Sequence, residues 1–362
     1  MTTTSKHGAL VQAEELKSFA IRAFEKVGVP PKHAEITADS MVLATLRGEG
    51  DHGSRLIAIW VHKIINGGTN PLTPLEVVQD KAAIGLLDAH NGIGAVAATY
   101  AMERAIAKAR EHGIGWVGVR NSNSLGSAKY YAMLALPHKM VGIALTNGVP
   151  LVVPPGGLTA RTGTNPFSIA VPAKSRPALV LDMATATIAY ERLRIYAARG
   201  ETIPKGWAIN RDGAPVEDPR EVSEDAFRKG GGLLPLGGYK GFGLSVMVNV
   251  LTGVFMGGAY MDGLSEFAPH NTPERDSFAL AAISIEHFMP YEEFLERMDD
   301  FIRVTKDSKL LPDVDQIYLP GERGFQREQE RRKNGIPLDW PTAEALRALA
   351  SELAIPSIPG LS

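Results

Sequence analysis

The chain has 362 residues, of which 44% are hydrophobic and 22% charged, and its formal net charge is -2. Such a composition is typical of a globular protein, and the balanced charge offers no basic field for nucleic acid. The absence of cysteine excludes disulfides, thiolate metal sites and cysteine nucleophiles. Because the N-terminus lacks an apolar segment of signal-peptide length and no stretch could span a bilayer, we expect a cytoplasmic protein without nucleic-acid or membrane partners.

Hydrophobic periodicity predicts three helices in the N-terminal third. Residues 14–27 place their apolar side chains on one helical face, and Gly28 ends that helix. A second helix is predicted over residues 31–46, with Pro31 at its start, and a third begins near Trp60.

The segment between the second and third helices carries the clearest chemistry. Residues 47–55 read Arg-Gly-Glu-Gly-Asp-His-Gly-Ser-Arg, at the C-terminal end of the second helix. A neutral histidine such as His52 takes up a proton near physiological pH, and a guanidinium such as that of Arg55 holds a carboxylate through two hydrogen bonds. Taken alone, the same residues fit an ordinary turn histidine and a solvated arginine.

Helices and strands follow one another along the rest of the chain. A short strand is predicted over residues 84–88, before a turn at His90-Asn91-Gly92, and an alanine-rich helix over 95–111. Strands are predicted at 114–119, 141–146, 167–171 and 178–182, a helix at 186–199, a buried helix at 244–256 and a strand at 278–285. Peripheral helices are predicted at 291–307 and 342–354. This mixture predicts an α/β or α+β fold.

Residues 113–118 match the dinucleotide-binding pattern GxGxxG, but the context is wrong. That pattern requires a strand before it and a helix opening after it, so that the helix N-terminus meets the pyrophosphate. Here a predicted helix precedes the glycines and a predicted strand runs through them. The sequence therefore excludes a conventional Rossmann site at this position.

Polar residues follow two of the predicted strands or lie between them. Thr146 and Asn147 come directly after a strand, where ligands often bind in open sheets. Thr164 and Asn165 lie in the turn Gly-Thr-Asn-Pro, which concentrates amide, hydroxyl and backbone donors.

Two further segments contain a single charged residue in an otherwise uncharged setting. Asp182 ends an apolar run ahead of Met183 and Ala184, and it would equally serve as a helix N-cap. Lys240 lies in the loop Gly-Gly-Tyr-Lys-Gly-Phe-Gly before a helix, which suits a phosphate or carboxylate, although the loop also fits a solvated lysine.

Taken together, these segments resemble the malate/L-lactate dehydrogenase family of the second type, which is unrelated to the Rossmann-type lactate and malate dehydrogenases. The family includes ureidoglycolate dehydrogenase, 2,3-diketogulonate reductase and the cyclic-ketimine reductases. The resemblance covers almost the whole chain. The ordered matches are the two N-terminal helices, Ala101-Met102, residues 163–166, residues 182–185, residues 203–208, Tyr239-Lys240-Gly241 and Pro320-Gly321-Glu322.

The resemblance implies a non-Rossmann NAD(P)-binding fold with a large mixed sheet flanked by helices, and a homodimer whose cofactor cleft is partly shared. Members transfer hydride between NADH or NADPH and a C=O or C=N bond beside a carboxylate. By this resemblance His52 is the catalytic acid/base, Asp182 orients it, and Arg55 clamps the substrate carboxylate.

The same resemblance assigns the remaining site residues. Substrate contacts are expected from Arg55, Asp51, Thr164 and Asn165. Cofactor contacts are expected from Ser124, Gly126, Thr146, Asn147, Asp182, Met183, Ala184 and Lys240. No metal is expected, and the choice between NAD and NADP stays open because no residue can be assigned to the ribose.

We expect a helical region over residues 1–120 with the site histidine and the start of the sheet, an NAD(P)-binding mixed-sheet core over 121–310, and a C-terminal segment over 311–362 that packs back on the N-terminal region.

The chain departs from the family pattern at three places. Asp51 replaces the usual serine before the histidine, and it favours the imidazolium if the two side chains face each other. Arg55 stands three residues after His52 instead of four, a spacing that shares one face of a helix. Ser124 replaces a histidine that is common in the family, and serine cannot act as a base at neutral pH. We therefore expect His52 to be the only acid/base, unless the chain has moved toward another substrate.

Three functions remain open from the sequence. The leading one is an NAD(P)-dependent oxidoreductase of a small 2-hydroxy or 2-oxo acid of the malate, lactate or ureidoglycolate type. The alternatives are a reductase of cyclic ketimines and a non-catalytic NAD(P)-binding relative.

Overall fold

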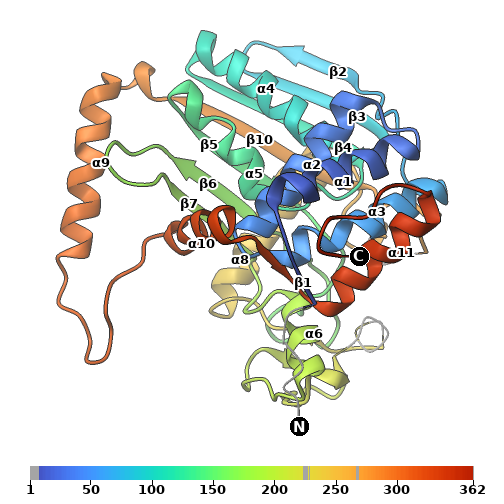
Figure 1. Cartoon of the computed structure of the whole chain (residues 1–362). Coiled ribbons are helices and arrows are strands. Elements are labelled where there is room, and N and C mark those ends of the chain that lie inside the picture. Colours follow the sequence, from blue (N-terminus) through green and yellow to red (C-terminus); the bar gives the residue numbers. More distant parts are fainter. Residues whose placement is uncertain (1–7, 223–226, 228, 266–268, 362) are drawn as a thin grey trace.

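The fold is built on a seven-stranded mixed sheet, seen in a computed structural model that describes residues 8–222, 227, 229–265 and 269–361 (Figure 1). The strand order is β2-β3-β4-β10-β5-β6-β7. β3 and β4 are parallel and every other neighbouring pair is antiparallel. The strands are β2 Glu76–Lys81, β3 Ile84–Gly92, β4 Ile114–Ser122, β5 Met140–Thr146, β6 Phe167–Val171, β7 Leu179–Met183 and β10 Asp276–Ser284. A mixed sheet flanked by helices confirms the predicted fold class.

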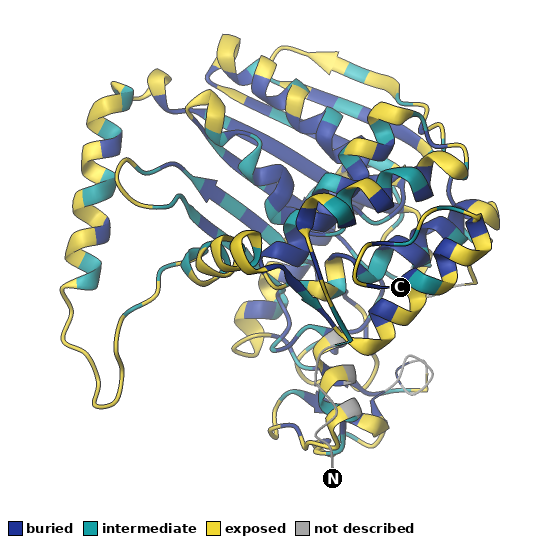
Figure 2. Cartoon of the chain, in the orientation of Figure 1, coloured by how far each residue is buried: buried dark blue, intermediate teal, exposed yellow. Residues whose placement is uncertain are grey.

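One face of the sheet carries the main core. α4 (Gly94–His112) and α5 (Ala128–Met133) lie directly on this face, and α2 (Pro31–Leu46) packs against both of them. α1 (Ala13–Lys26) and α3 (Arg55–Ile65) complete the same hydrophobic cluster, whose buried stripes are visible on the inner sides of these helices (Figure 2). The alanine-rich sequence of α4 allows this close approach, since small side chains let a helix lie near a sheet.

The opposite face is covered by α8 (Tyr239–Asn249), which continues into a π-helical turn at Val250–Val254. Because side chains alternate along a strand, Ala144 of β5 joins the main core while Leu145 packs in a separate cluster with Val248 and Met256.

A smaller lobe is inserted after β7. It has its own hydrophobic cluster and contains α6 (Tyr190–Arg199), β8 (Ala208–Ile209) and β9 (Gly232–Leu233), and it lies at the bottom of Figure 1. The chain then returns through α8 to the sheet, so the lobe and the sheet meet at the residues that follow β7.

The C-terminal segment packs back across the molecule. α9 (Tyr291–Lys306) stands at the outer side of β6 and β7, and α10 (Glu322–Asn334) lies against α2 (Figure 1). β11 (Ile336–Leu338) pairs antiparallel with β1 (Ala9–Val11), and α11 (Trp340–Leu353) contacts α1 and α3. The Val180 amide of β7 donates to the carbonyl of Pro320 at 3.0 Å, so the edge strand is capped by the same segment.

The three glycines of the GxGxxG pattern serve packing, as the sequence context predicts. Gly113 ends α4 in the left-handed region with φ +81, and the other two lie inside β4. A Cβ at Gly115 would collide with the carbonyl of Ala105 in α4, and one at Gly118 with the sulfur of Met256. These glycines let the helices approach β4 and form no phosphate loop.

Several predicted elements need correction. The third helix begins at Arg55 instead of Trp60, and the predicted turn at residues 90–92 is part of β3, with His90 and Asn91 at positive φ. The helix predicted over 186–199 begins only at Tyr190, so Asp182 belongs to β7 and caps no helix. The helix predicted as buried over 244–256 begins at Tyr239, and one of its faces is exposed, with Phe255 70% accessible. β1, β2, β11, α5 and α10 were not predicted, because they are short or strongly polar.

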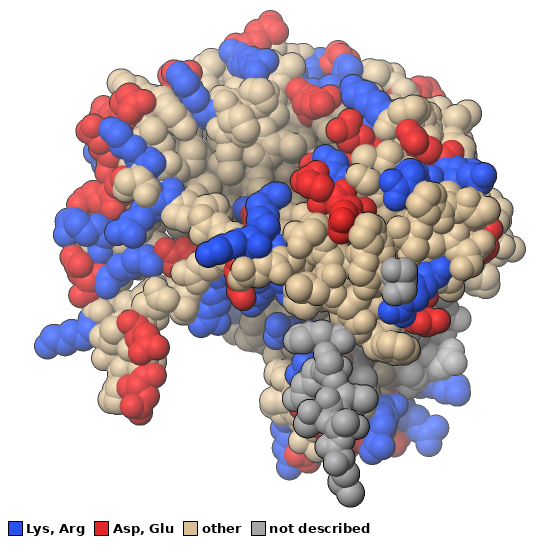
Figure 3. All heavy atoms as spheres, in the orientation of Figure 1, with Lys and Arg blue, Asp and Glu red and all other residues tan. Residues whose placement is uncertain are grey.

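Charged side chains of both signs are interspersed over the face of the molecule shown in Figure 3. No helix of the described residues is long and apolar enough to cross a bilayer. The described residues also contain no group of three or more His, Asp or Glu side chains arranged to hold a metal ion.

Candidate active site

The loop that carries His52 is folded back on the end of α2. Residues 50–52 form a 3₁₀ turn in which the His52 amide donates to the carbonyl of Glu49 at 3.2 Å. The Ser54 amide donates to the Thr45 hydroxyl at 2.8 Å. A Cβ at Gly53 would overlap that hydroxyl, so only glycine permits the close approach. His52 is therefore held at the surface of a rigid loop.

The neighbours of His52 do not lie as the sequence suggests. The Asp51 carboxylate accepts a hydrogen bond from the His52 backbone amide at 3.2 Å, so it supports the turn locally. Arg55 is the first residue of α3, whereas His52 belongs to the preceding 3₁₀ turn, and Gly53 separates the two with φ -115 and ψ -130. The expectation that both residues share one helix face is wrong because the chain breaks at Gly53.

Asp182 lies among charged residues from four other parts of the chain. Lys129 of α5 places its Nζ 3.5 Å from Asp182 Oδ2 and forms an ion pair with Glu49, whose other oxygen accepts from the Ser127 hydroxyl at 2.8 Å. Lys129 and Asp182 are each 13% exposed. His52 acts on Asp182 through its charge.

Asp182, Lys129 and Glu49 line a cleft of about 760 Å³. Its walls come from the end of α2, from α5, β7 and α6, and from residues 314–327. The charged residues that line it are Arg47, Glu49, Lys129, Asp182, Arg192, Arg323 and Arg327. Because cations outnumber carboxylates here, the cleft suits an anionic ligand.

Burial shifts the pKa of each of Asp182 and Lys129 in one direction, and the nearby opposite charges shift it in the other. Burial raises the pKa of the Asp182 carboxyl, while the charges of Lys129 and His52 lower it again. Burial also lowers the pKa of the Lys129 ammonium, against the attraction of Asp182, and the nearby guanidinium groups of Arg47 and Arg327 lower it further. Both groups are thus nearer to exchanging a proton than they would be in water.

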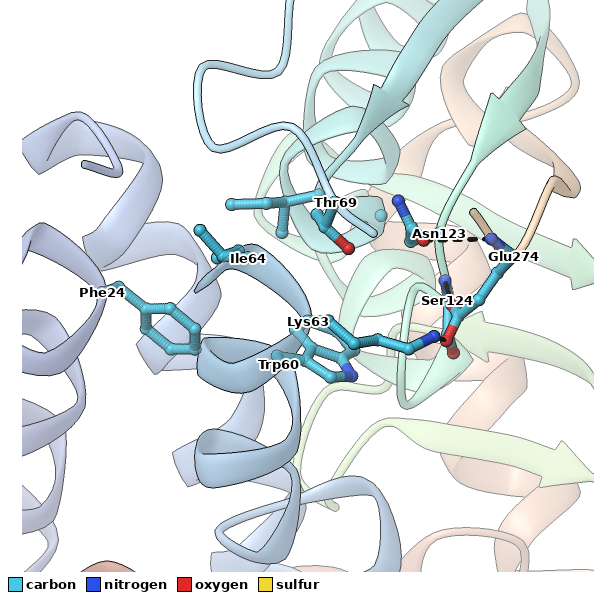
Figure 4. Close-up of a pocket in the computed structure, with 10 residues that line it drawn as sticks. Phe24, Trp60, Lys63, Ile64, Thr69, Asn123, Ser124 and Glu274 are labelled. Carbon is cyan, nitrogen blue, oxygen red and sulfur yellow. Dashed lines mark hydrogen bonds and ion pairs between the residues drawn. The ribbon is translucent and has the colours of Figure 1, made fainter. Parts of the chain in front are cut away.

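Ser124 lies at a second, nearly filled pocket (Figure 4). This pocket is next to the loop that carries His52. Its amide donates to the carboxylate of Glu274, which also forms a buried ion pair with Lys63. The Ser124 hydroxyl accepts from the Gly126 amide at 3.3 Å. A Cβ at Gly126 would lie 3.8 Å from the carbonyl oxygen of His52, so the Ser124–Gly126 turn backs directly onto the histidine loop.

The strand-end residues form a separate polar network at α8. Asn165 is fully buried, donates to the carbonyl and hydroxyl oxygens of Ser245 at 2.9 Å, and accepts from the Gly148 amide. Asn147 is buried and bonded in the same way to Ala259 and Ser277.

Thr146 is also buried, and its hydroxyl donates to the Asn147 carbonyl at 3.0 Å. The carbonyl of Thr164 accepts from both the amide and the hydroxyl of Thr185. These residues therefore connect the end of β5, the 163–166 turn and the segment after Asp182, and the amides of Asn147 and Asn165 are used by the fold.

The Lys240 loop is open at the start of α8. Gly237 and Gly238 have φ +58 and +67, and a Cβ at either position would meet no atom within 4 Å. Lys240 is exposed in the first turn of α8, whose N-terminus carries a partial positive charge. Met183 and Ala184 are partly exposed between this loop and the Asp182 cleft.

Lys129 and Glu49 could not be recognised from the sequence as partners of Asp182. Lys129 is an isolated lysine in a short helix of small and aromatic residues, and Glu49 lies in the histidine segment without a distinguishing pattern. Arg192, Arg323 and Arg327 were also missed, since only the fold brings α6 and α10 to the cleft.

Comparison with known proteins adds an independent result. The family model described as malate/L-lactate dehydrogenase matches residues 11–347. A malate dehydrogenase of Pyrococcus abyssi is 40% identical over 355 residues, covering 95% of each chain. An L-sulfolactate dehydrogenase of Methanocaldococcus jannaschii is 35% identical over 350 residues, covering 96% of this chain and 98% of the relative. The solved malate dehydrogenase of Entamoeba histolytica superposes with a TM-score of 0.92 at 31% identity, covering 96% of this chain and 98% of that one.

Proposed function

The chain belongs to the malate/L-lactate dehydrogenase family, and from this premise we propose that it is an NAD(P)-dependent oxidoreductase that interconverts a small 2-hydroxy acid and the corresponding 2-oxo acid. The observation that carries the proposal is the cleft that Glu49 of the histidine loop lines together with Asp182, a largely buried carboxylate among cations. Such a cleft accepts an anionic substrate, and we place His52, three residues after Glu49, at its edge as the proton-exchanging group.

A nicotinamide cofactor held by Lys240 and the stretch from Asp182 to Ala184 would supply or take up the hydride. His52 gives a proton to the substrate oxygen during reduction and takes it back during oxidation. The charge of His52 lowers the pKa of the Asp182 carboxyl, so the two groups are electrostatically coupled. Arg55, at the start of α3, holds the substrate carboxylate.

For the cofactor, we assign the phosphates to Lys240 and the N-terminus of α8, and the nicotinamide end to the stretch from Asp182 to Ala184. The open glycines before Lys240 support the first assignment, because they leave the backbone accessible to a ligand. We also assign cofactor contacts to the turn at Ser124 and Gly126 and to the strand end at Thr146 and Asn147. Both NAD and NADP are compatible with this arrangement.

We also propose that the protein acts as a homodimer. Large apolar side chains are exposed on α9, including Phe301 at 56%, and on α8 and just beyond the π-helical turn that follows it, including Met247 at 55% and Phe255 at 70%. Exposed apolar surface on helices is typical of interfaces between subunits.

A reductase screen tests the function directly. Wild-type protein is assayed with NADH and NADPH in parallel against pyruvate, oxaloacetate, further 2-oxo acids and cyclic 2-imino acids, and His52→Ala is assayed on every accepted substrate. We expect turnover of at least one 2-oxo acid and a loss of about 10²- to 10⁴-fold in His52→Ala. His112→Ala, at the end of α4, is the matched control and keeps wild-type activity.

Unchanged turnover in His52→Ala would disprove the role of this residue. Preference for a cyclic imino acid would favour a ketimine reductase. Tight binding of NADH without turnover of any substrate would identify a non-catalytic binding protein.

A further inference from the structure

The Asp182 carboxyl has a charged neighbour that the reaction itself does not require. Lys129 reaches it from α5, and Glu49 contacts the same ammonium from the histidine loop. Lys129 forms an ion pair with Asp182 at 3.5 Å, whereas His52 acts on it through its charge. Lys129 is only 13% exposed and lies within reach of two carboxylates at the wall of a cleft. It is therefore not an ordinary solvated surface lysine.

The explanation rests on the environment of Asp182. Removing a carboxylate from water favours its neutral acid form, and a neutral acid gives no electrostatic support to a protonated histidine. A cation placed against the carboxylate offsets this cost. We propose that Lys129, anchored by Glu49, is a positioning residue that keeps Asp182 ionised, so that Asp182 can support His52 in proton exchange. This inference rests on the proposed function of His52.

Glu49 has the complementary task. It fixes the ammonium by an ion pair and is itself held by the Ser127 hydroxyl at 2.8 Å, one residue before α5. Because Glu49 lies three residues before His52, the ion pair also joins the histidine loop to α5. The negative charge of Glu49 opposes the effect of Lys129 on Asp182. The electrostatic potential at the Asp182 carboxylate therefore depends on both residues.

The other charged groups around Asp182 define the background. They come from α2, the 3₁₀ turn, α6 and α10. These groups are Arg47, His52, Arg192, Arg323 and Arg327. None of the arginines is the hydrogen-bonding partner of the carboxylate, so the variants described next leave this background unchanged.

The test measures how kcat/KM for oxidation of the hydroxy acid depends on pH in the wild type and three variants. Oxidation needs a base at His52 that ionised Asp182 supports, so protonation of the Asp182 carboxyl produces the acidic limb. Lys129→Met removes a positive charge, which raises the pKa of Asp182, and the limb moves up by about one pH unit. Glu49→Gln removes a negative charge and moves the limb in the opposite direction. Lys129→Arg keeps the charge and restores the wild-type position.

Asp182→Asn shows whether Lys129 acts through Asp182. In the Asp182→Asn background, Lys129→Met should cause no further loss and no further shift of the limb. A purely structural role would lower activity in every variant without moving the limb. Equal limbs in wild type and Lys129→Met, shifts of the same sign in Lys129→Met and Glu49→Gln, or no restoration by Lys129→Arg would overturn the proposal.

A second measurement needs no turnover. The carboxyl carbon of Asp182 is followed by ¹³C NMR in aspartate-labelled protein and assigned by its disappearance in Asp182→Asn. We expect the titration midpoint to rise in Lys129→Met and to fall in Glu49→Gln. If the wild type oxidises no hydroxy acid, the proposed function fails, while this titration still decides whether Lys129 controls Asp182. An unchanged midpoint in both variants would refute that control.

Discussion

At the scale of single residues, the structure separates charges that serve the cleft from charges that serve the core. Lys129 and Asp182 line open space, whereas Lys63 and Glu274 are only 4% and 5% exposed and fill their pocket (Figure 4). Glu274 also accepts the Ser124 amide, so it fixes the turn behind His52. Removing one partner of such an ion pair is destabilising, because the other partner would be left as a buried, unpaired charge.

We predict that Lys63→Met destabilises the protein by about 3–5 kcal/mol, since it leaves the Glu274 carboxylate buried without its cation. The free energy of unfolding in urea measures the effect. Lys63→Met combined with Glu274→Gln should recover much of the loss. Arg303→Ala, which breaks an exposed pair with Asp300, is the control and should cost less than about 1 kcal/mol. Equal losses in Lys63→Met and Arg303→Ala would contradict this account.

At the scale of elements, β4 illustrates how a sequence pattern can mislead. Its glycines match a nucleotide-binding pattern, yet they lie against the carbonyl of Ala105 and the side chain of Met256. Their spacing follows the packing of α4 on one face and of the turn after α8 on the other.

Gly115→Ala is therefore expected to lower stability by about 1–3 kcal/mol, because the added methyl group forces α4 away from β4. Thermal unfolding gives the stability, and NADH titration of the folded fraction should give a wild-type affinity. Gly85→Ala in the neighbouring strand is the control, since its nearest contact would be an ordinary 3.4 Å. Loss of NADH affinity with unchanged stability would show that these glycines bind the cofactor after all.

The elements that were predicted from the sequence are those with strong periodicity. α1 and β6 follow from their apolar patterns because a buried face requires one, whereas α2 was placed by Pro31 at its start. β2 is exposed along almost its whole length, and α10 has no buried residue, so neither leaves such a pattern.

The residues of the candidate site also divide into those that could be proposed from the sequence and those that could not. His52 and Asp182 could be proposed because an imidazole in a glycine-rich loop and a carboxylate after an apolar run are unusual in any sequence. Lys129 could not, since its meaning depends on the packing of α5 against β7. The start of α3 at Arg55 was missed because it depends on a tertiary contact. Gly53 lies against Thr45 of α2, and this contact ends the 3₁₀ turn and lets the next helix begin.

At the scale of the whole molecule, α9 is the element least explained by a single chain. It stands at the outer side of the sheet and is largely exposed (Figure 2). Its buried side chains are Leu295 and Ile302, while Phe301 and Val304 are each 56% exposed. A helix with apolar residues on two faces is suited to packing on two partners.

We predict that the protein has about twice the mass of its 38.9 kDa chain in solution, as measured by light scattering after size exclusion. Phe301→Glu combined with Val304→Glu should produce monomers, because charge in a subunit interface is costly to desolvate. Leu72→Glu, at an apolar residue that is 62% exposed elsewhere, is the control and should remain dimeric. A wild-type mass of one chain would refute the homodimer.

The hydrogen bond between Val180 and Pro320 has a consequence for synthesis of the protein on the ribosome. Until Pro320 has emerged, β7 is an open edge strand, and the wall of the cleft formed by residues 314–327 does not exist. An uncovered edge of this kind invites pairing with other nascent chains. The cleft around the Asp182 carboxylate is thus completed only after Pro320 has been made, so a chain terminated before it would carry His52 and Asp182 and still lack a finished cleft.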